Sequence, residues 1–185
     1  MWNLNNALGL VEYLKIPTGM VALDKMCKTS DIKVVYAATL CPGKYVVLFK
    51  GTLASVKAAL ELSEREFLSN TIDTMILGNP KEEIYNAISG TTSSKIEGAL
   101  GIVESYSVAS IVEASDIAAK SNEISLIELR LARGMCGKSF FTITGDLASV
   151  ESAIEISSKY LKEKGMYLDS GVIANPDKDI KVNFY

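Results

Sequence analysis

The sequence contains no histidine among its 185 residues. Histidine is the side chain that most often acts as a general base near neutral pH, and it is the commonest metal ligand. Its absence excludes Ser-His-Asp and Cys-His arrangements, together with every zinc site that contains histidine. Any chemistry would have to use cysteine, carboxylate, lysine, serine or tyrosine side chains.

Long hydrophobic runs and a cationic leader are also missing. The longest apolar stretches, such as residues 34–41, are far shorter than the roughly 18 residues that a membrane-spanning helix needs. The first six residues contain no lysine or arginine, so we expect no signal peptide. Only three cysteines are present, an odd number that argues against a disulfide framework. We therefore expect a cytoplasmic protein with no membrane contact.

The composition that remains is typical of a folded protein. Hydrophobic residues make up 48% of the chain and charged residues 22%, which is enough for a substantial core and excludes intrinsic disorder. The net charge of -3 argues against nucleic acid as the main partner. The length suits one large domain or two small ones.

An internal repeat organises the chain. Residues 7–12 (Ala-Leu-Gly-Leu-Val-Glu) recur as residues 99–104 (Ala-Leu-Gly-Ile-Val-Glu). Further matches follow in the same order: Asp24 with Asp116, Lys28 with Lys120, Gly43-Lys44 with Gly137-Lys138, Gly51 with Gly145, and Asn79-Pro80 with Asn175-Pro176. These matches predict two homologous domains, residues 1–88 and 99–185, joined by a linker over 89–98.

Each copy predicts the same succession of elements. The expected strands are residues 7–13, 32–39, 45–50 and 75–77 in the first copy, and 99–106, 124–131, 139–144 and 171–173 in the second. The expected helices cover residues 18–29 and 108–121, and a further helix follows Gly51 and Gly145, the latter capped by Asp146. Short loops between the middle strands favour antiparallel hairpins. The predicted fold class is α+β, with helices packed on one face of an antiparallel sheet in each domain.

Three segments of the first copy resemble the shell-protein (BMC) domain of bacterial microcompartments. They are residues 7–12, the turn at 28–32 and the helix entry at 51–56. Because the resemblance covers nearly the whole chain twice, it implies the tandem-domain class of shell proteins. In that class three chains form a pseudo-hexameric tile, and tiles pack into the shell. The resemblance therefore implies a homotrimeric structural protein, not an enzyme, that contacts other shell proteins at tile edges.

The resemblance extends to the segment Cys41-Pro42-Gly43-Lys44. In similar tandem-domain proteins the matching cysteine holds an iron–sulfur cluster on the three-fold axis. This implies one [4Fe–4S] cluster per trimer, bound by Cys41 from three chains, for electron transfer across the shell. Cys27, Cys41 and Cys136 are not spaced like the cysteine runs that hold a cluster within one chain. A closed three-fold oligomer would instead supply three equivalent thiolates and leave one iron open to water or to a partner such as a redox enzyme.

The glycine-bearing loops of both copies are expected to line the central pore of the tile. The residues concerned are Cys41, Pro42, Gly43, Lys44, Gly134, Met135, Cys136 and Gly137. An alternative function is therefore a metal-free tile whose pore conducts small metabolites. Cys136 aligns with Pro42, not with Cys41. We interpret it as a passive pore-lining thiol, with a fourth ligand or another metal site as the alternatives.

Other residues have both a functional and a purely structural interpretation. Lys28 and Lys120 match lysines that lie along the tile edges in the family, so the resemblance implies the same edge role here. The structural alternative is a solvated lysine near a helix C-terminus, which the helix dipole favours. The segments that follow Asn79 and Asn175 depart from the usual edge sequence of the family. Cys27 aligns with the small residue Ala119, so we expect it in the core.

Two further hypotheses have less support. A stand-alone enzyme with Cys41 as nucleophile lacks an evident base to activate the thiol. A module that binds a metabolite between its two domains has no sequence feature in its favour.

Overall fold

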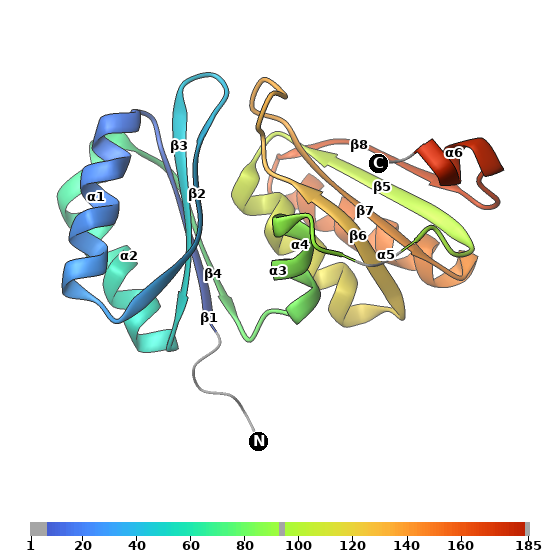
Figure 1. Ribbon diagram of the computed structural model, residues 1–185, viewed down its shortest axis with the longest axis horizontal. Helices are drawn as coiled ribbons and strands as arrows, with labels where there is room; N and C mark the ends of the chain where they lie inside the picture. The colour runs from blue at the N-terminus through green and yellow to red at the C-terminus, as the bar shows by residue number, and fades with distance from the viewer. Residues whose placement is uncertain (1–6, 93–94, 184–185) are drawn as a thin grey trace. The chain divides into compact units, whose positions relative to one another are not determined.

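The computed structural model describes residues 7–92 and 95–183 (Figure 1). Its contacts divide the chain into two compact units. The first unit comprises residues up to 80 together with the loop 132–137, and the second comprises residues 81–131 and those from 138 onward. Among the described residues, no helix is both long and apolar enough to cross a membrane.

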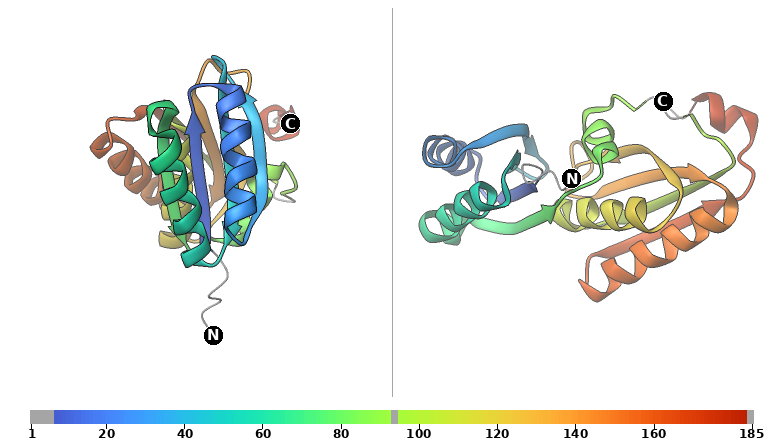
Figure 2. Two further views of the ribbon diagram at one scale, coloured as in Figure 1. Left: turned by 90° about the vertical axis from the view of Figure 1, so that its left-hand side faces the viewer. Right: turned by 90° about the horizontal axis from the view of Figure 1, so that it is seen from below.

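The first unit is built on a four-stranded antiparallel sheet with the strand order β2-β3-β1-β4. Its strands are β1 (Ala7–Tyr13), β2 (Ile32–Leu40), β3 (Lys44–Gly51) and β4 (Thr71–Gly78). The helices are α1 (Ile16–Thr29) and α2 (Leu53–Phe67), followed by the short 3-10 helix η1 (Leu68–Asn70). Figure 2 shows α1 and α2 side by side on one face of the sheet.

The second unit repeats this arrangement with the strand order β6-β7-β5-β8. Its strands are β5 (Ala99–Ser105), β6 (Ile124–Arg130), β7 (Ser139–Gly145) and β8 (Tyr167–Ile173). Its helices are α3 (Glu82–Ser89), α4 (Val108–Ser121), α5 (Leu147–Glu163) and α6 (Lys178–Asn183). The predicted α+β class, with an antiparallel sheet and helices in each copy, is confirmed.

The two sheets share their irregularities as well as their order. β2 shifts register against β3 between Val34 and Tyr36, and β6 shifts against β7 between Leu126 and Glu128. Such a bulge places one extra residue on an edge strand and increases its twist. The bulges lie at repeat-related positions, which confirms that the two sheets have the same structure.

The helices approach the central strand of each sheet closely at a glycine. A Cβ atom added to Gly9 would lie 2.8 Å from Val56 on α2, and one added to Gly101 would lie 2.8 Å from Val150 on α5. Real side chains do not tolerate such distances, so glycine allows the helix layer to reach the sheet at both sites.

The core of the first unit lies between its sheet and its two helices. Tyr13, Phe49 and Met26 are fully buried there, and the Tyr13 hydroxyl lies 2.7 Å from Oγ of Ser63. Burial raises the pKa of Tyr13 to about 12, although the hydrogen bond to Ser63 opposes the shift. This buried polar pair ties β1 to α2.

Two sequence expectations need correction. Cys27 is exposed, so the expectation of a core position is wrong. The buried residues of α1 are Gly19, Ala22 and Met26, and Cys27 lies off that stripe. The short helices α3 and α6 were also not expected, and α3 packs against β6 and α4 of the second unit.

Candidate functional site

The first candidate pore loop is a tight turn between β2 and β3. The backbone N–H of Gly43 donates to the carbonyl oxygen of Leu40 at 2.8 Å, and the Cys41–Pro42 peptide bond is cis. Gly43 has a φ of 89°, a conformation that residues with a side chain rarely adopt. No heavy atom lies within 4 Å of the position that a Cβ at Gly43 would occupy. Within the described residues, the loop tip is therefore open.

Cys41 and Lys44 sit at the two ends of this turn. Cys41 is a free, half-buried thiol. Lys44 places its Nζ 3.5 Å from Oε2 of Glu12, whose carboxylate is almost completely buried. The buried carboxylate of Glu12 therefore gives the ammonium of Lys44 a fixed counter-charge.

The second candidate loop follows β6 and reproduces the end of the first. Gly137 has the same φ of 89° as Gly43, which confirms their alignment across the repeat. Cys136 precedes Gly137 as Pro42 precedes Gly43, but it is exposed and has a φ of 52°, which a proline ring does not allow. The loop 132–137 belongs to the same compact unit as the first loop, and a Cβ at Gly137 would lie 3.5 Å from the carbonyl oxygen of Cys41. Gly134, with a φ of 74°, and Met135 complete the turn.

Arg133 is a loop residue that the sequence reasoning did not single out. It is exposed in the two-residue insertion of the second copy, five positions before Lys138. The insertion itself is the sequence signal that would have identified it. Together with Lys138, it gives the second loop two positive charges and no acidic residue.

The donor set for a metal is small within one chain. The described part of the chain contains no group of three or more cysteine or carboxylate side chains that could hold a metal ion. Cys41 nevertheless offers a free thiol beside an open turn, and this suits a ligand that is shared between chains. The residues therefore fit an iron–sulfur cluster only if several copies of Cys41 converge.

The two candidate edge lysines have different surroundings. Lys28 forms an ion pair with Asp24 at 2.7 Å, and both side chains are largely exposed. Lys120 forms the repeat-related pair with Asp116 at 2.5 Å, but the Asp116 side chain is only 4% exposed. Oδ1 of Asp116 also accepts a hydrogen bond from the backbone N–H of Lys81 at 3.0 Å. Lys28 is thus accessible, whereas the partner of Lys120 is covered by the segment that enters α3.

The outer faces of α1 and α4 differ in the same way. Met20 on α1 is 55% exposed, whereas its repeat partner Val112 on α4 is fully buried. Cys27 is likewise exposed and Ala119 buried. Partial burial of the sulfur, and then the charge of Asp24, raise the pKa of Cys27. The outer stripe of α1, defined here by Pro17, Met20, Asp24 and Cys27, is therefore exposed where the matching stripe of α4 is buried.

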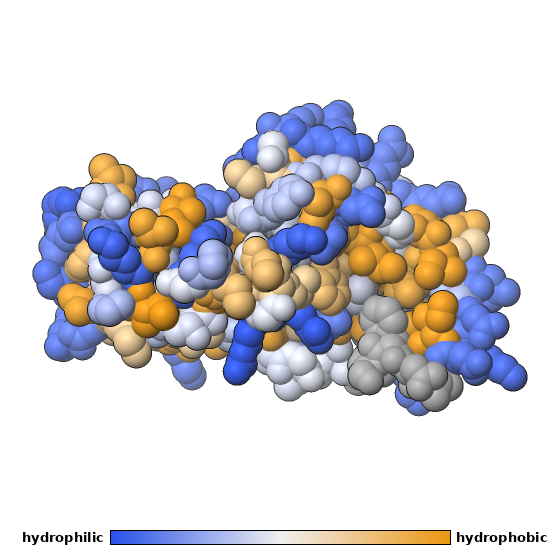
Figure 3. All heavy atoms as spheres, turned by 90° about the horizontal axis from the view of Figure 1, so that it is seen from above, coloured by the Kyte–Doolittle hydropathy of each residue, from blue (hydrophilic) through white to orange (hydrophobic). Residues whose placement is uncertain are grey.

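Apolar side chains reach the surface at other places too. The space-filling view shows them between polar groups across the visible face (Figure 3). The exposed large hydrophobic residues of the first unit include Leu14, Met20, Val21 and Leu68.

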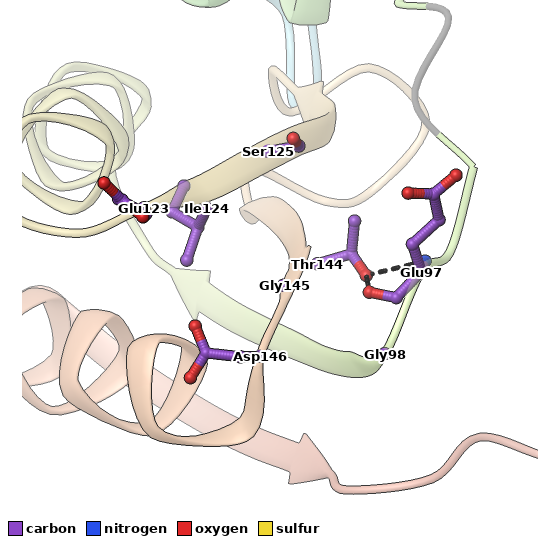
Figure 4. A pocket seen from close by; sticks show the side chains of 8 residues that line it. All are labelled: Glu97, Gly98, Glu123, Ile124, Ser125, Thr144, Gly145 and Asp146. Carbon is purple, nitrogen blue, oxygen red and sulfur yellow. Dashed lines mark hydrogen bonds between the residues drawn. The ribbon is translucent and has the colours of Figure 1, made fainter.

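A hollow in the second unit contains three acidic residues, Glu97, Glu123 and Asp146. Figure 4 shows that their carboxylates lie apart and do not converge on one point. Thr144 accepts from the backbone N–H of Glu97 at 3.0 Å and donates to its carbonyl oxygen at 2.6 Å. Asp146 accepts from the backbone N–H of Ser149 at 3.0 Å as the N-cap of α5, as expected. These side chains therefore hold the chain in place at this point and do not form a ligand site.

Known proteins show the same organisation. The BMC domain model matches residues 7–80 and 99–176. The bacterial microcompartment shell protein PduT from Citrobacter freundii is 30% identical over 177 residues, which cover 96% of each protein. The carboxysome assembly protein CcmO from Synechococcus elongatus is 24% identical over 94% of this chain and 67% of its own length.

Solved structures agree with this result. The crystal structure of a microcompartment protein from Desulfitobacterium hafniense has a TM-score of 0.89 and 38% identity, and the match covers 96% of this chain and 98% of that one. A fused permuted hexameric shell protein from the RMM microcompartment has a TM-score of 0.65 at 15% identity and shares the fold.

The chain therefore belongs to the BMC-domain family, with two copies of the domain. Its similarity to PduT over nearly the whole of both proteins makes it a bacterial microcompartment shell protein of the PduT type. Such proteins are structural and not enzymatic, which confirms the expectation from the sequence.

Proposed function

We propose that three copies of this chain form a pseudo-hexameric tile of a microcompartment shell. The observation that carries the proposal is the unequal burial of the outer stripes of α1 and α4. Asp116 and Val112 on α4 are buried within a single chain, whereas Asp24 and Met20 on α1 are exposed.

The outer stripes of α1 and α4 stand at matching positions of the repeat. A protein surface like the one that packs on α4 would therefore also fit α1. An exposed stripe that contains Pro17, Met20 and Cys27 leaves apolar surface in water at a cost of about 25 cal/mol per Å². A second copy of the chain can supply to α1 the kind of cover that α4 has in its own chain. In a closed ring of three chains, the outer stripe of α1 in every chain would be buried by a neighbouring chain, and no stripe would stay exposed.

We further propose that Cys41 from each chain binds one [4Fe–4S] cluster in this trimer. The support is a free thiol at an open turn, together with the similarity to PduT over 96% of the chain. When bound, the cluster would supply one-electron transfer across the shell. The positive φ of Gly43 would allow the backbone to approach such a group, and Cys136, at the position of Pro42, would line the pore without binding iron.

The test is the iron and acid-labile sulfide content of protein that is purified without oxygen. We expect about four irons per trimer by the ligand count of such clusters. Cys41→Ser should abolish iron binding, whereas the matched control Cys136→Ser should keep it. Loss of iron in both variants would overturn the assignment of the ligands, and iron-free protein after anaerobic reconstitution would overturn the cluster.

A second candidate function is a metal-free pore for small metabolites, and the charge of the loops favours it. Arg133 and Lys138 give each second loop two positive charges, so a three-fold pore would attract anions. Colourless protein after reconstitution, combined with slower uptake of a small carboxylate by intact shells when Arg133→Ala and Lys138→Ala are combined, would support this function. Unchanged uptake in the double variant would contradict it.

Contact with other shell proteins is the last part of the proposal. Lys28 is the better candidate for a tile edge, because its side chain and that of Asp24 are both exposed. Lys120 holds a largely buried carboxylate within the chain, so we expect it to contribute less to packing between tiles.

A further inference from the structure

Helices α3 and α6 occupy the same place in the two repeats but have different surroundings. Each follows the last strand of its copy and an Asn-Pro pair, at residues 79–80 and 175–176. α3 belongs to the second compact unit. It packs against β6 and α4, and Ile84 is fully buried in that contact.

The contact of α3 is held by polar groups as well. The backbone N–H of Lys81 donates to Oδ1 of Asp116, and Oγ1 of Thr92 donates to the carbonyl oxygen of Ile127 at 2.6 Å. Burial, and then the charge of Asp116, raise the pKa of Tyr85 to about 12. The segment 81–92 is therefore a clamp that closes over the edge formed by α4 and β6.

Among the described elements of the second unit, α6 has no contact comparable with that of α3. Ile180 stands at the repeat position of Ile84, and it is 40% exposed instead of fully buried. Among the described elements, α6 packs on no strand or helix to the extent that α3 packs on β6. Its apolar residue therefore lacks the cover that its counterpart has.

The surface that would accept α6 is exposed in the first unit. Asp24, the counterpart of Asp116, is exposed, and its pair with Lys28 reproduces the pair of Asp116 with Lys120. Val34 on β2 is 39% exposed, whereas its counterpart Leu126 on β6 is 1% exposed. The α1–β2 edge of the first unit is thus exposed, whereas the matching α4–β6 edge of the second unit is covered by α3.

We propose that the C-terminal segment of one chain, residues 175–183, docks on the α1–β2 edge of a second copy of this chain. The occupant follows from the repeat, because Lys81 and Ile84 have counterparts in Asp177 and Ile180, and Asp116 has its counterpart in Asp24. The backbone N–H of Asp177 corresponds to that of Lys81 and would donate to Asp24. This inference rests on the proposed trimer, and it explains how neighbouring chains clamp one another within it.

The test is photo-crosslinking from position 180 in the full-length protein. The photoreactive residue p-benzoylphenylalanine replaces Ile180, and light- and heavy-isotope chains are mixed before irradiation. We expect cross-links between chains that join position 180 to the segment 24–37. The matched control carries the same residue at Tyr85 and should cross-link within one chain to peptides of the second unit.

The outcomes separate this inference from the proposed function. Native mass spectrometry of the same samples reports the number of chains. A trimer whose cross-links from position 180 stay within one chain, or join other segments, overturns the clamp and leaves the tile intact. A protein that stays a single chain overturns both. A second variant, Ile180→Asp, should raise the dissociation constant of the trimer at least tenfold, whereas an unchanged constant would contradict the clamp.

Discussion

At the scale of single residues, each copy is stabilised by a different set of buried hydroxyl groups and helix caps. The first copy uses Tyr13 with Ser63 in its core and Thr52 as the N-cap of α2. The second copy has Ser105 at the position of Tyr13 and Asp146 at the position of Thr52. Matched variants in the two copies therefore separate the effect of a side chain from the effect of the fold.

Removal of the Tyr13 hydroxyl should destabilise the protein. In Tyr13→Phe the buried Oγ of Ser63 loses its partner at 2.7 Å, and a lost hydrogen bond of this kind costs about 1 kcal/mol. Urea unfolding measures the loss, and the exposed Tyr106→Phe serves as the control. An equal stability of both variants would show that the pair contributes nothing.

The ionisation of Tyr13 should also limit stability at high pH. Its folded pKa is about 12, above the ordinary value of 10.0, so the folded state retains the proton more tightly. The associated stability is complete below pH 10 and is lost as the pH rises from about 10 to 12. Unfolding midpoints should therefore fall less steeply across this range in Tyr13→Phe than in the unsubstituted protein.

The two N-caps should respond differently to acid. Hydrogen bonds from Ser149 lower the pKa of Asp146, so its stabilising effect is present above the ordinary pKa and is lost as the pH falls through the lowered value. Thr52 has no charge to lose. We expect Asp146→Thr to weaken the decline of the unfolding midpoint below pH 4, and Thr52→Asp to strengthen it. If the unfolding midpoints of the two variants fall equally with pH below pH 4, this expectation is wrong.

At the scale of elements, the distance between the helix layer and the sheet is set by one glycine in each central strand. A Cβ at Gly9 would meet Val56 on α2 at 2.8 Å and the ring of Phe49 on β3 at 2.6 Å, so α2 and the Phe49 side chain would have to shift. The neighbouring strand β4 offers a control, because a Cβ at Gly78 would have no heavy atom within 4 Å.

Gly9→Ala should therefore destabilise the first unit by about 1–3 kcal/mol, the usual cost of overpacking. Gly78→Ala should change the free energy of unfolding by less than about 0.5 kcal/mol, which is typical of open surface sites. Chemical denaturation of both variants provides the comparison. If both variants lose a similar free energy of unfolding, the close approach of α2 at Gly9 does not limit stability.

At the scale of the whole molecule, the repeat is nearly symmetric in sequence and unequal in burial. Val112 is buried and Met20 exposed, Asp116 is buried and Asp24 exposed, and Ile84 is buried and Ile180 exposed. The three buried residues all belong to contacts within the second unit. In the proposed trimer, a second copy of the chain would cover all three exposed residues.

A charge in the outer stripe of α1 should break this assembly. We expect Met20→Asp to lower the mass measured by sedimentation from that of three chains to that of one, because a carboxylate cannot be buried without a partner. The exposed Leu68→Asp is the control and should keep the larger mass. A trimer of Met20→Asp would show that this stripe is not the contact between chains.

Much of the fold was predictable because the repeat supplied each element twice. The strands around residues 7–13 and 99–105, the hairpins and the cap at Asp146 follow from local patterns and turn residues, and the structure confirms them. The helices at 82–89 and 178–183 were missed, since such short helices carry little periodicity. Cys27 was assigned to the core because its counterpart is small, but its side chain lies on the outer stripe.

The sequence by itself determined the fold class, the duplication and the residues of the candidate loops. Those depend on local periodicity and on the order of matched residues along the chain. Only the tertiary structure decided which copy of each matched surface is covered, as Asp116 is covered by the segment at Lys81 and Asp24 is not. Burial depends on contacts between segments that lie far apart in the chain, and two nearly identical patterns cannot show which of them has a partner.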